Sequence, residues 1–346
     1  MEFLTWLWLG KPLWMWLAFI AIVVVLLALD LGVLHRKQRE IGVRESLILS
    51  AAYIALGLGF GGWVWWYMGE GAGLAYMTGF VIEKSLAMDN VFVIAMIFTY
   101  FAVPRLYQHR VLFWGILGVI VLRAIMIGVG AAMVQQFGWV LYLFAAFLIV
   151  TGIKMWLTAE KDYDVGSSAV LRWLRRRLPV TEGLHGDRFW VRKADPGTGR
   201  PAWFITPLFL ALAMVEIVDV VFAVDSVPAI FAITSDPFIV YTSNIFAILG
   251  LRALYFALAA MVHRFHYLKY ALAVLLVFIG SKIFVADALG LAKIPPAVSL
   301  SATFAILAAG VGWSLWKTRH RAPITPLPGR EGPGVGPPKA AETPTP

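Results

Sequence analysis

Long apolar stretches separated by short polar segments run along most of the chain, from residue 13 to residue 316. A helix needs about 20 apolar residues to cross about 30 Å of hydrocarbon, and nine stretches reach that length. The pattern therefore predicts an all-α membrane protein with about nine transmembrane helices. These are expected near residues 13–34, 46–67, 73–101, 110–133, 138–157, 204–232, 239–262, 269–289 and 297–316. No small-residue cleavage site follows the first stretch, so we expect it to be a retained span.

The composition supports this interpretation. Of the 346 residues, 60% are hydrophobic and 14% are charged, whereas about 25% of the residues of a soluble domain are charged. A soluble fold of this size could not hide so much apolar surface, which excludes both a soluble globular protein and a disordered chain. The sequence contains no cysteine, which excludes disulfides, iron–sulfur clusters and thiolate zinc sites.

Lysine and arginine are distributed unevenly between alternate loops, and this asymmetry predicts the orientation of the helices. With the N-terminus outside, the inner loops carry 22 of the 29 basic residues, the outer side carries two and the spans contain five. We therefore expect a multi-pass protein of the inner cell membrane, surrounded by lipid, with its C-terminus in the cytoplasm. Topology accounts for the net charge of +9, so a nucleic-acid partner is not expected.

Two polar segments differ in character from the apolar stretches. We assign residues 1–321 to a transmembrane transport domain, within which the cytoplasmic loop 158–203 is long and basic. Leu171 and Leu174 of this loop lie beside arginines, a pattern compatible with a short interfacial helix or with a plain linker. Proline and glycine are frequent in residues 322–346, so this cytoplasmic tail is expected to be disordered.

Three features recur in the same order in two parts of the chain. A motif of an acid, five residues, aspartate, a small polar residue and valine occurs at residues 83–91 and again at 219–227. Leu-Arg-Ala recurs in the fourth and seventh stretches, and glycine followed two residues later by lysine recurs in the fifth and eighth. Residues 72–157 and 204–289 therefore form a predicted repeat of two three-helix units. With three helices each, the units have opposite topology, which is typical of secondary transporters with a site near the midplane.

Six carboxylates and five cations lie inside the apolar stretches, where each unpaired charge costs roughly 2.5–3.5 kcal/mol. Together they would cost on the order of 30 kcal/mol, which exceeds the stability of most folds. They must therefore face one another, water or an ion. The candidate ligands for a metal ion are Glu83, Asp89, Asn90, Glu216, Asp219, Asp225 and Ser226.

The intramembrane cations have a structural interpretation, since lysine and arginine can neutralise acids or extend toward the helix ends. Arg123 is one of these cations. For Glu83 and Asp219 the sequence leaves two roles open, a metal ligand and an ion-pair partner. Asp89 and Asp225 are the favoured ligands, because each is followed by a residue with a side-chain oxygen.

Helical spacing limits how these acids combine. Glu83 and Asp89 are six residues apart, which is about 120° around a regular helix. They reach one ion only if the helix is broken; otherwise they form two sites, or one site and a proton relay. Pro228 withholds a hydrogen bond from the carbonyl of Val224, which offers a further oxygen ligand beside Asp225.

The predicted donors are all oxygens, which suit hard divalent cations such as Mg²⁺, Ca²⁺ and Mn²⁺. Met88 and Met214 lie beside the acids, where a thioether would favour Mn²⁺ unless it simply packs. No histidine recurs with the spacing of a zinc site, and no phosphate-binding loop or nucleophile motif occurs. Two intramembrane aspartates would suit a protease, but a protease would not need the acids around them. We expect neither enzymatic activity nor a permanently bound cofactor.

Four segments resemble motifs of the TerC family of membrane proteins, within a similarity that covers about residues 12–316. They are residues 29–36, 79–92, 215–234 (VEIVDVVFAVDSVPAIFAIT) and 243–255. The family is named for tellurium resistance, its bacterial members are linked to manganese export and metal homeostasis, and it is similar to the LysE-like exporters. The resemblance places the acids of the family motifs on Glu83, Asp89, Glu216, Asp219 and Asp225.

The resemblance and the acids together predict the export of a divalent cation, with Mn²⁺ as the favoured cargo. Tellurite is an anion, for which intramembrane carboxylates are a poor pathway, so tellurite resistance is interpreted as indirect. Outward movement of a divalent ion against 100 mV costs about 4.6 kcal/mol, so exchange for protons is expected. The alternative is a non-transporting membrane assembly or metal-stress partner that docks through loop 158–203. A homo-oligomer or a membrane partner protein is compatible with either function.

Overall fold

The computed structural model describes residues 5–32, 42–159, 164–194, 199–258, 267–290 and 294–318. Its helices are α1 (Leu13–Gly32), α2 (Val43–Met68), α3 (Glu70–Tyr100), α4 (Arg105–Gln136), α5 (Val140–Thr158), α6 (Ala169–Arg177), α7 (Pro207–Phe231), α8 (Pro237–Ile248), α9 (Leu251–Leu258), α10 (Leu268–Ala288) and α11 (Pro296–Thr318). Two antiparallel strand pairs join β1 (Leu7–Trp8) to β2 (Lys11–Pro12) and β3 (Trp190–Ala194) to β4 (Pro201–Ile205). The predicted disordered tail, residues 322–346, lies outside the described residues.

The helices confirm a mainly α-helical membrane protein. Within the described part of the chain, seven helical segments are long and apolar enough to cross a bilayer: α2, α4, α5, α7, α8 with α9, α10 and α11. The other two predicted spans correspond to α1 and α3. The apolar part of α1 is shorter, at Leu13–Leu29, and α3 carries Glu83, Lys84 and Asp89.

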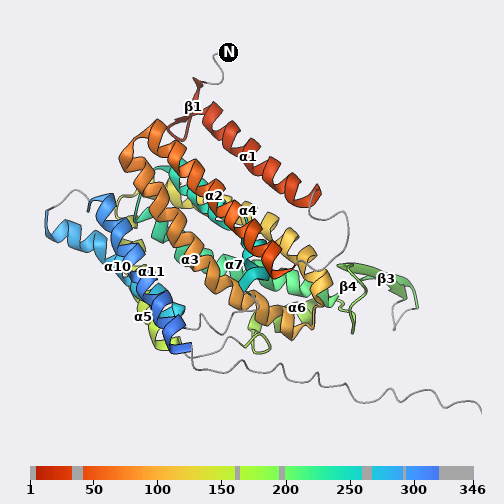
Figure 1. Cartoon of the computed structure of the whole chain (residues 1–346). Helices are drawn as coiled ribbons and strands as arrows, with labels where there is room; N and C mark the ends of the chain where they lie inside the picture. Colours follow the sequence, from red (N-terminus) through yellow and green to blue (C-terminus); the bar gives the residue numbers. More distant parts are fainter. Residues whose placement is uncertain are drawn as a thin grey trace, which may run out of the picture.

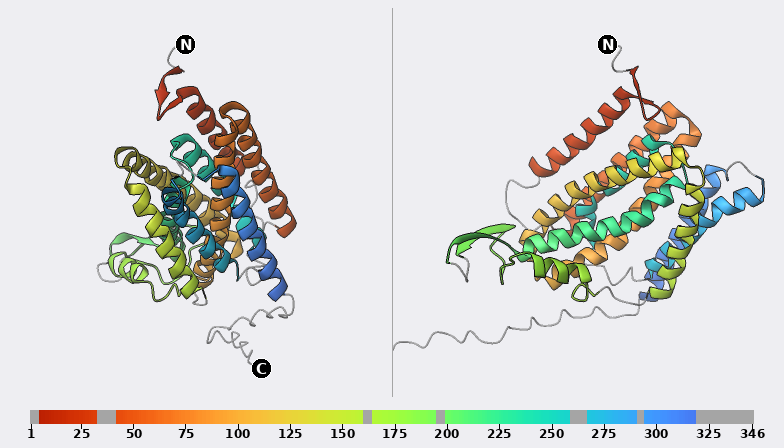
Figure 2. Two further views of the ribbon diagram at one scale, coloured as in Figure 1. Left: turned by 90° about the vertical axis from the view of Figure 1, so that its left-hand side faces the viewer. Right: turned by 180° about the vertical axis from the view of Figure 1, so that it is seen from behind.

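The 31-residue helix α3 lies at the centre of the bundle. It contacts α2, α7, α8 and α11, while α4 packs against α7 and α8. Figures 1 and 2 show α5, α10 and α11 gathered on one side of this bundle and α1 on the opposite side. The centre of the bundle is therefore enclosed by helices that are far apart in the sequence.

Helices α5 and α10 approach each other closely because each presents a glycine at the contact. A Cβ atom at Gly152 would lie 2.7 Å from the carbonyl oxygen of Ala273, and one at Gly280 would lie 2.6 Å from that of Ala145. Small residues let helix backbones approach in this way in membranes.

The predicted span 239–262 corresponds to one candidate span, Pro237–Leu258, which is divided into two helices. Helix α8 ends at Ile248, and α9 begins at Leu251 after Gly250, whose φ is +85°. Glycine adopts this left-handed conformation without steric cost, and it commonly follows the last residue of a helix. The break leaves carbonyl groups at the end of α8, and the Lys84 ammonium donates to the carbonyl of Ala247 at 3.0 Å.

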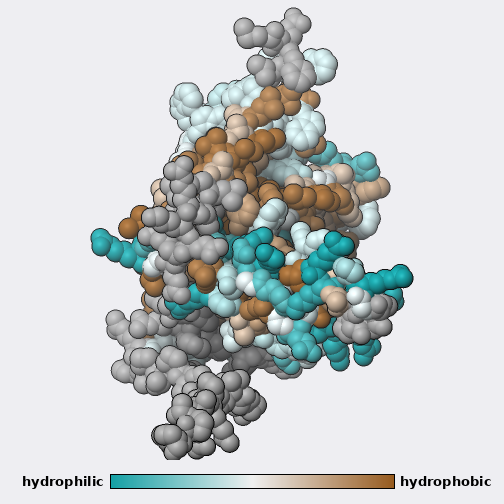
Figure 3. Space-filling view, turned by 90° about the vertical axis from the view of Figure 1, so that its right-hand side faces the viewer, coloured by the Kyte–Doolittle hydropathy of each residue, from teal (hydrophilic) through white to brown (hydrophobic). Residues whose placement is uncertain are grey.

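The loop 158–203 contains regular structure in its described part. Helix α6 forms where a short helix was considered, and Ser168 caps it by accepting a hydrogen bond from the Leu171 amide at 3.4 Å. Leu171 and Leu174 pack into the protein core, whereas Trp173 is exposed. Figure 3 shows hydrophilic side chains gathered at the end of the molecule that carries α6, β3 and β4, beside a largely apolar face.

Candidate functional site

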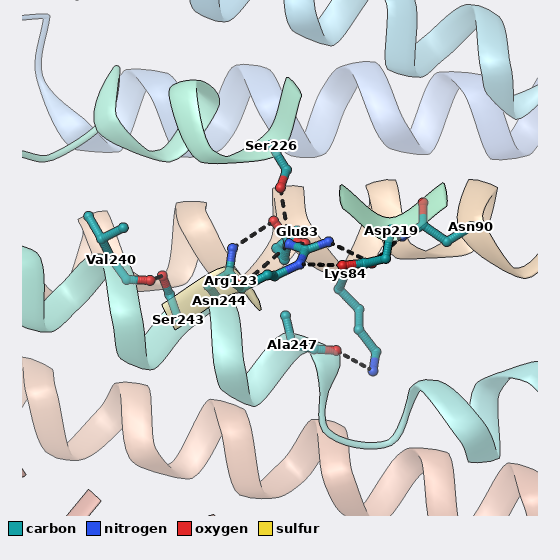
Figure 4. Close-up of polar contacts among 10 residues, drawn as sticks. All are labelled: Glu83, Lys84, Asn90, Arg123, Asp219, Ser226, Val240, Ser243, Asn244 and Ala247. Carbon is teal, nitrogen blue, oxygen red and sulfur yellow. Dashed lines mark hydrogen bonds and ion pairs between the residues drawn. The ribbon is translucent and has the colours of Figure 1, made fainter. Parts of the chain in front are cut away.

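Six polar side chains from four helices form one buried network, which we call the Arg123 network (Figure 4). Its members are Glu83 and Asn90 of α3, Arg123 of α4, Asp219 and Ser226 of α7, and Asn244 of α8. No member is more than 5% exposed. The network therefore connects the helices at the centre of the bundle through charged and polar groups.

The Arg123 guanidinium bridges two acids from different helices. Its Nε and Nη2 donate to the two carboxylate oxygens of Asp219, each at 3.2 Å, and its Nη1 forms an ion pair with Oε1 of Glu83. Nη1 also donates to the Ser226 hydroxyl at 3.0 Å and to Oδ1 of Asn244 at 3.3 Å. A planar guanidinium with five N–H donors is suited to binding several acceptors at once.

Two asparagines complete the hydrogen bonding of the acids. Nδ2 of Asn244 donates to Oε2 of Glu83 at 3.0 Å, and Nδ2 of Asn90 donates to Oδ1 of Asp219 at 3.3 Å. All four carboxylate oxygens therefore accept a hydrogen bond. With both acids ionised, the network holds two negative charges and one positive charge. Complete pairing of this kind is what allows ions to remain in apolar surroundings.

The two sequence motifs contribute equivalent positions to the network. Residues seven apart in a helix point in nearly the same direction, about 20° from each other, so the first acid and the polar residue of each motif share a face. These pairs are Glu83 with Asn90 and Asp219 with Ser226. The second acids, Asp89 and Asp225, are six residues along and point about 120° away.

Asp89 and Asp225 consequently have different neighbours. Asp225 is partly buried against α5, where Thr151 and the positively charged Lys154 are its neighbours. Asp89 is partly buried near Lys269, at the start of α10. Helices α3 and α7 are continuous through these residues, and α7 continues through Pro228. A broken helix would be needed to bring all the acids of α3, or all those of α7, to a single ion. Neither helix is broken.

Glu216 lies at the edge of the contact between α4 and α7. Its carboxylate packs against Gly118, where an added Cβ would overlap it. Trp114 and Val121, on the same side of α4, are about half exposed. Oε2 of Glu216 is buried and has no hydrogen-bond partner within the described part of the chain. Gly118 thus makes room for a carboxylate whose hydrogen bonding is incomplete.

A small cavity adjoins the Arg123 network. Asn90 and Asp219 form its polar lining, and Gly115 and Val119 of α4 lie among the other residues around it. Its volume is about 10 Å³, roughly the room that one water molecule needs. Oδ1 of Asn90 has no hydrogen-bond partner among the described residues. An unused oxygen therefore lies in the lining beside the Asp219 carboxylate.

The predicted metal ligands fall in separate places. Across the described residues, no three histidine, aspartate or glutamate side chains form a group that could hold a metal ion. Arg123 occupies the position between Glu83 and Asp219, and helical spacing separates the remaining acids. The network contains Glu83, Asn90, Asp219 and Ser226, the α4–α7 edge contains Glu216, and Asp89 and Asp225 lie on other helix faces.

Sequence reasoning missed several contributors to these sites. Asn244 completes the hydrogen bonding of Glu83, and Gly118 makes room for Glu216. An amide inside an apolar helix is itself a signal, because it must find a partner in the membrane. That signal could have identified Asn244. Nothing in the spacing of Thr151 or Lys269 links them to the aspartates, because those contacts join distant helices.

Comparisons with known proteins show that the chain is similar to integral membrane proteins. The profile of the "Integral membrane protein TerC family" matches residues 68–322. A Myxococcus xanthus protein named "Uncharacterized membrane protein STKORF319" is 49% identical over 311 residues, which cover 90% of this chain and 94% of the relative. The Escherichia coli (strain K12) protein named "Putative membrane-bound redox modulator Alx" is 47% identical over 307 residues, which cover 86% of this chain and 92% of the relative. No solved structure matches the chain.

Proposed function

The chain belongs to the TerC family of integral membrane proteins, and we propose that it exports a divalent metal cation, with Mn²⁺ as the favoured cargo. The observation that carries this proposal is the pair of buried acids, Glu83 and Asp219, held between helices beside a small cavity that Asp219 itself lines. Ionisable groups inside a membrane are costly and typically mark an ion pathway. Their oxygen donors suit a hard divalent ion, which enters the site as substrate.

The cargo ion is proposed to contact ligands from the three places described above during its passage. The cavity offers it the Asp219 carboxylate and the unused oxygen of Asn90. Asp89 and Asp225 lie along α3 and α7 at equivalent positions of the two motifs, which suits two successive binding positions. In this scheme Glu83 and Ser226 complete the oxygen shell at the centre. The ligands thus act in sequence, since continuous helices keep them apart.

We also propose that α3–α5 and α7–α10 form an inverted repeat, and that α1 and α3 cross the membrane to give nine spans. The contact between α5 and α10 supports the repeat. Gly152 meets Ala273 and Val277, while Gly280 meets Ala145 and Ile149. Each residue of α10 follows its counterpart in α5 by the same number of residues: Gly280 corresponds to Gly152, Ala273 to Ala145 and Val277 to Ile149. The glycine of each helix therefore meets the residues that correspond to those around the other glycine. Such exchange is expected about a pseudo-two-fold axis.

The proposed location is the inner membrane, with the N-terminus outside and the C-terminus in the cytoplasm. Residues 164–194 and 199–203, which include α6, β3 and the first part of β4, carry eight lysines and arginines and three acids. Basic segments of this kind remain preferentially on the cytoplasmic side. This end of the bundle is then the side from which the cargo enters.

Protons are the proposed counter-ion, and Glu216 is the proposed proton carrier. Its Oε2 lacks a hydrogen-bond partner within the described chain, and an ionised carboxylate with incomplete pairing is costly in apolar surroundings. Binding a proton removes that cost without requiring a second side chain. Glu216 lies three residues before Asp219 on α7, so protonation there can be felt at the central acids through their mutual repulsion.

A flux measurement in proteoliposomes tests the proposed function. Purified protein is reconstituted around a dye that is quenched by Mn²⁺, and uptake is followed with and without a pH gradient, with Mg²⁺ and Ca²⁺ as competitors. Asp89→Asn and Asp225→Asn are expected to lower the flux at least tenfold. Asp287→Asn, at an exposed position near the end of α10, is the matched control and should leave it unchanged. Well-folded protein without flux under any gradient would refute the proposal.

A second candidate is a non-transporting partner in membrane assembly or metal stress, linked to tellurite resistance. The exposed arginines and Trp173 of α6 favour it, because they present a surface for another protein. The name of the Escherichia coli relative suggests a redox role, but this chain has no cysteine for thiol exchange. Replacing Arg172 and Trp173 with alanine should abolish a docking function and leave Mn²⁺ flux intact.

A further inference from the structure

We infer that the Arg123 guanidinium is a tethered substitute for the cargo cation, which must leave Glu83 and Asp219 before a divalent ion can bind them. This inference rests on the proposed function and adds to it a competitor built into the chain. It accounts for a central site that holds two acids and yet keeps all of their oxygens occupied.

The contacts of Arg123 define the competition. The guanidinium uses both oxygens of Asp219 and Oε1 of Glu83, which are the oxygens that a metal ion between these acids would need. The remaining oxygen, Oε2 of Glu83, accepts from Asn244. An ion and the guanidinium cannot occupy the same position, because both are cations and both bind the same atoms.

The charges fit an exchange. With both acids ionised, Arg123 cancels one of the two negative charges, whereas a divalent ion in its place would cancel both. Lys84 does not compensate for the difference, because its ammonium points away to the Ala247 carbonyl at the end of α8 (Figure 4). The acids are therefore better neutralised by the cargo than by the arginine, while the arginine prevents a bare double negative charge when no cargo is bound.

The surroundings provide a place for the incoming ion. Gly115 and Val119, which line the cavity, lie eight and four residues before Arg123 on α4, so they point to a similar side of that helix. The cavity thus opens beside Asp219 on the arginine's own side. There Oδ1 of Asn90, to which the guanidinium does not donate, supplies a further oxygen ligand for the ion.

Ser226 and Asn244 are neutral acceptors for the same nitrogen of Arg123, Nη1, at 3.0 and 3.3 Å. They allow the guanidinium to keep hydrogen bonds while it releases the carboxylates. In this arrangement the tethered cation holds α3 and α7 together. Divalent binding is coupled to a shift of Arg123 and so to the packing of α4.

Thermal unfolding of the full-length protein in detergent micelles, with increasing MnCl₂, tests the exchange. Arg123→Met removes the competitor and introduces no metal ligand. We expect it to lower the melting temperature without metal, and Mn²⁺ to restore stability with a half-maximal concentration at least fivefold below that of the wild type. Arg252→Met is the matched control, because Arg252 occupies the equivalent Leu-Arg-Ala position and is also buried. Arg252→Met should also have a lower melting temperature, and Mn²⁺ should not restore it.

The inference would be overturned if wild type and Arg123→Met were stabilised by Mn²⁺ at the same half-maximal concentration. It would also be overturned if Mn²⁺ restored the melting temperatures of Arg123→Met and Arg252→Met equally. If Arg123→Met does not fold, Arg123→Lys provides the test. Lysine keeps one charge but cannot bind two carboxylates through a planar fork. It is expected to bind Mn²⁺ more tightly than wild type, and an unchanged response would count against the exchange. If the wild type transports Mn²⁺ but Mn²⁺ does not restore the melting temperature of Arg123→Met, this inference alone is refuted. If the wild type shows no flux, the proposed function is refuted.

Discussion

The centre of the bundle and the α4–α7 edge hold carboxylates in opposite states of hydrogen bonding. In the Arg123 network, each oxygen of Glu83 and Asp219 accepts a hydrogen bond. At the edge, Oε2 of Glu216 is buried with no partner in the described residues. The comparison separates two uses of buried acids. Those at the centre hold α3, α4 and α7 together through Arg123, while the acid at the edge keeps a buried oxygen without a partner in the described residues.

The difference arises from position on one helix. Asp219 and Glu216 are three residues apart on α7, so both point toward α4 within about 60° of each other. Arg123 of α4 meets the first, and Gly118 of the same helix meets the second. A long donor at one position and the smallest residue at the other therefore determine which acid is paired.

The largest expected effect on stability follows from Glu83→Gln. The change keeps the shape of the side chain and removes one of the two charges that hold Arg123. Breaking a buried pair by removing one partner costs about 3 kcal/mol or more. We expect a loss of that size in the free energy of unfolding, measured by denaturant titration in mixed micelles. A loss below about 1 kcal/mol would mean that Asp219 alone satisfies the arginine.

Lys84→Met is expected to have an intermediate effect. The ammonium donates to the Ala247 carbonyl at 3.0 Å, at the C-terminal end of α8 where a positive charge is favourable. Removing the donor leaves that carbonyl without its charged partner, so the expected loss is about 1 kcal/mol in the same titration. Lys193→Met, at an exposed position of β3, is the matched control and should cost nothing measurable.

Gly118→Ala is expected to have a smaller effect. The added methyl group overlaps the Glu216 carboxylate, which is the mobile end of a flexible side chain and can move away. Alanine also favours a helix over glycine by up to about 1 kcal/mol, so the net change in stability should be within about 0.5 kcal/mol. Mn²⁺ flux should fall severalfold because the carboxylate is displaced. Gly59→Ala, where an added Cβ meets nothing within 4 Å, should leave the flux unchanged. Unaltered flux in Gly118→Ala would show that the position of Glu216 is unimportant.

The fold class and the choice of important residues could be predicted because both depend on local chemistry. Apolar length reveals helices, and a charge in an apolar helix is conspicuous wherever it lies. The spacing within each motif also predicted that Glu83 and Asp89 would point in different directions. The break at Gly250 was missed, because glycine also occurs inside transmembrane helices where no break follows.

Partner choice could not be predicted, because it depends on which helices meet. The sequence left Glu83 and Asp219 open between metal ligand and ion pair. The structure pairs both acids with Arg123 of α4. That helix belongs only to the first of the two predicted repeat units, so its contact with Asp219 of the second unit could not be read from the motifs. The strands of loop 158–203 were missed for a similar reason, since residues 190–194 and 201–205 gain their regularity from each other.

The smallest expected change in stability is that of Glu216→Gln, and this variant sharpens the comparison most. Glutamine keeps the volume beside Gly118 and breaks no ion pair found among the described residues, so the free energy of unfolding should change by less than about 0.5 kcal/mol. If Glu216 carries the exchanged proton, the variant loses the ability of a pH gradient to drive Mn²⁺ movement and retains exchange of Mn²⁺ for Mn²⁺. Glu83→Gln should impair both, because it alters the central site itself. Proteoliposomes assayed with a pH gradient and then with Mn²⁺ on both sides distinguish the two patterns. Equal loss in both assays for Glu216→Gln would assign this acid to cargo binding and remove the distinction between edge and centre.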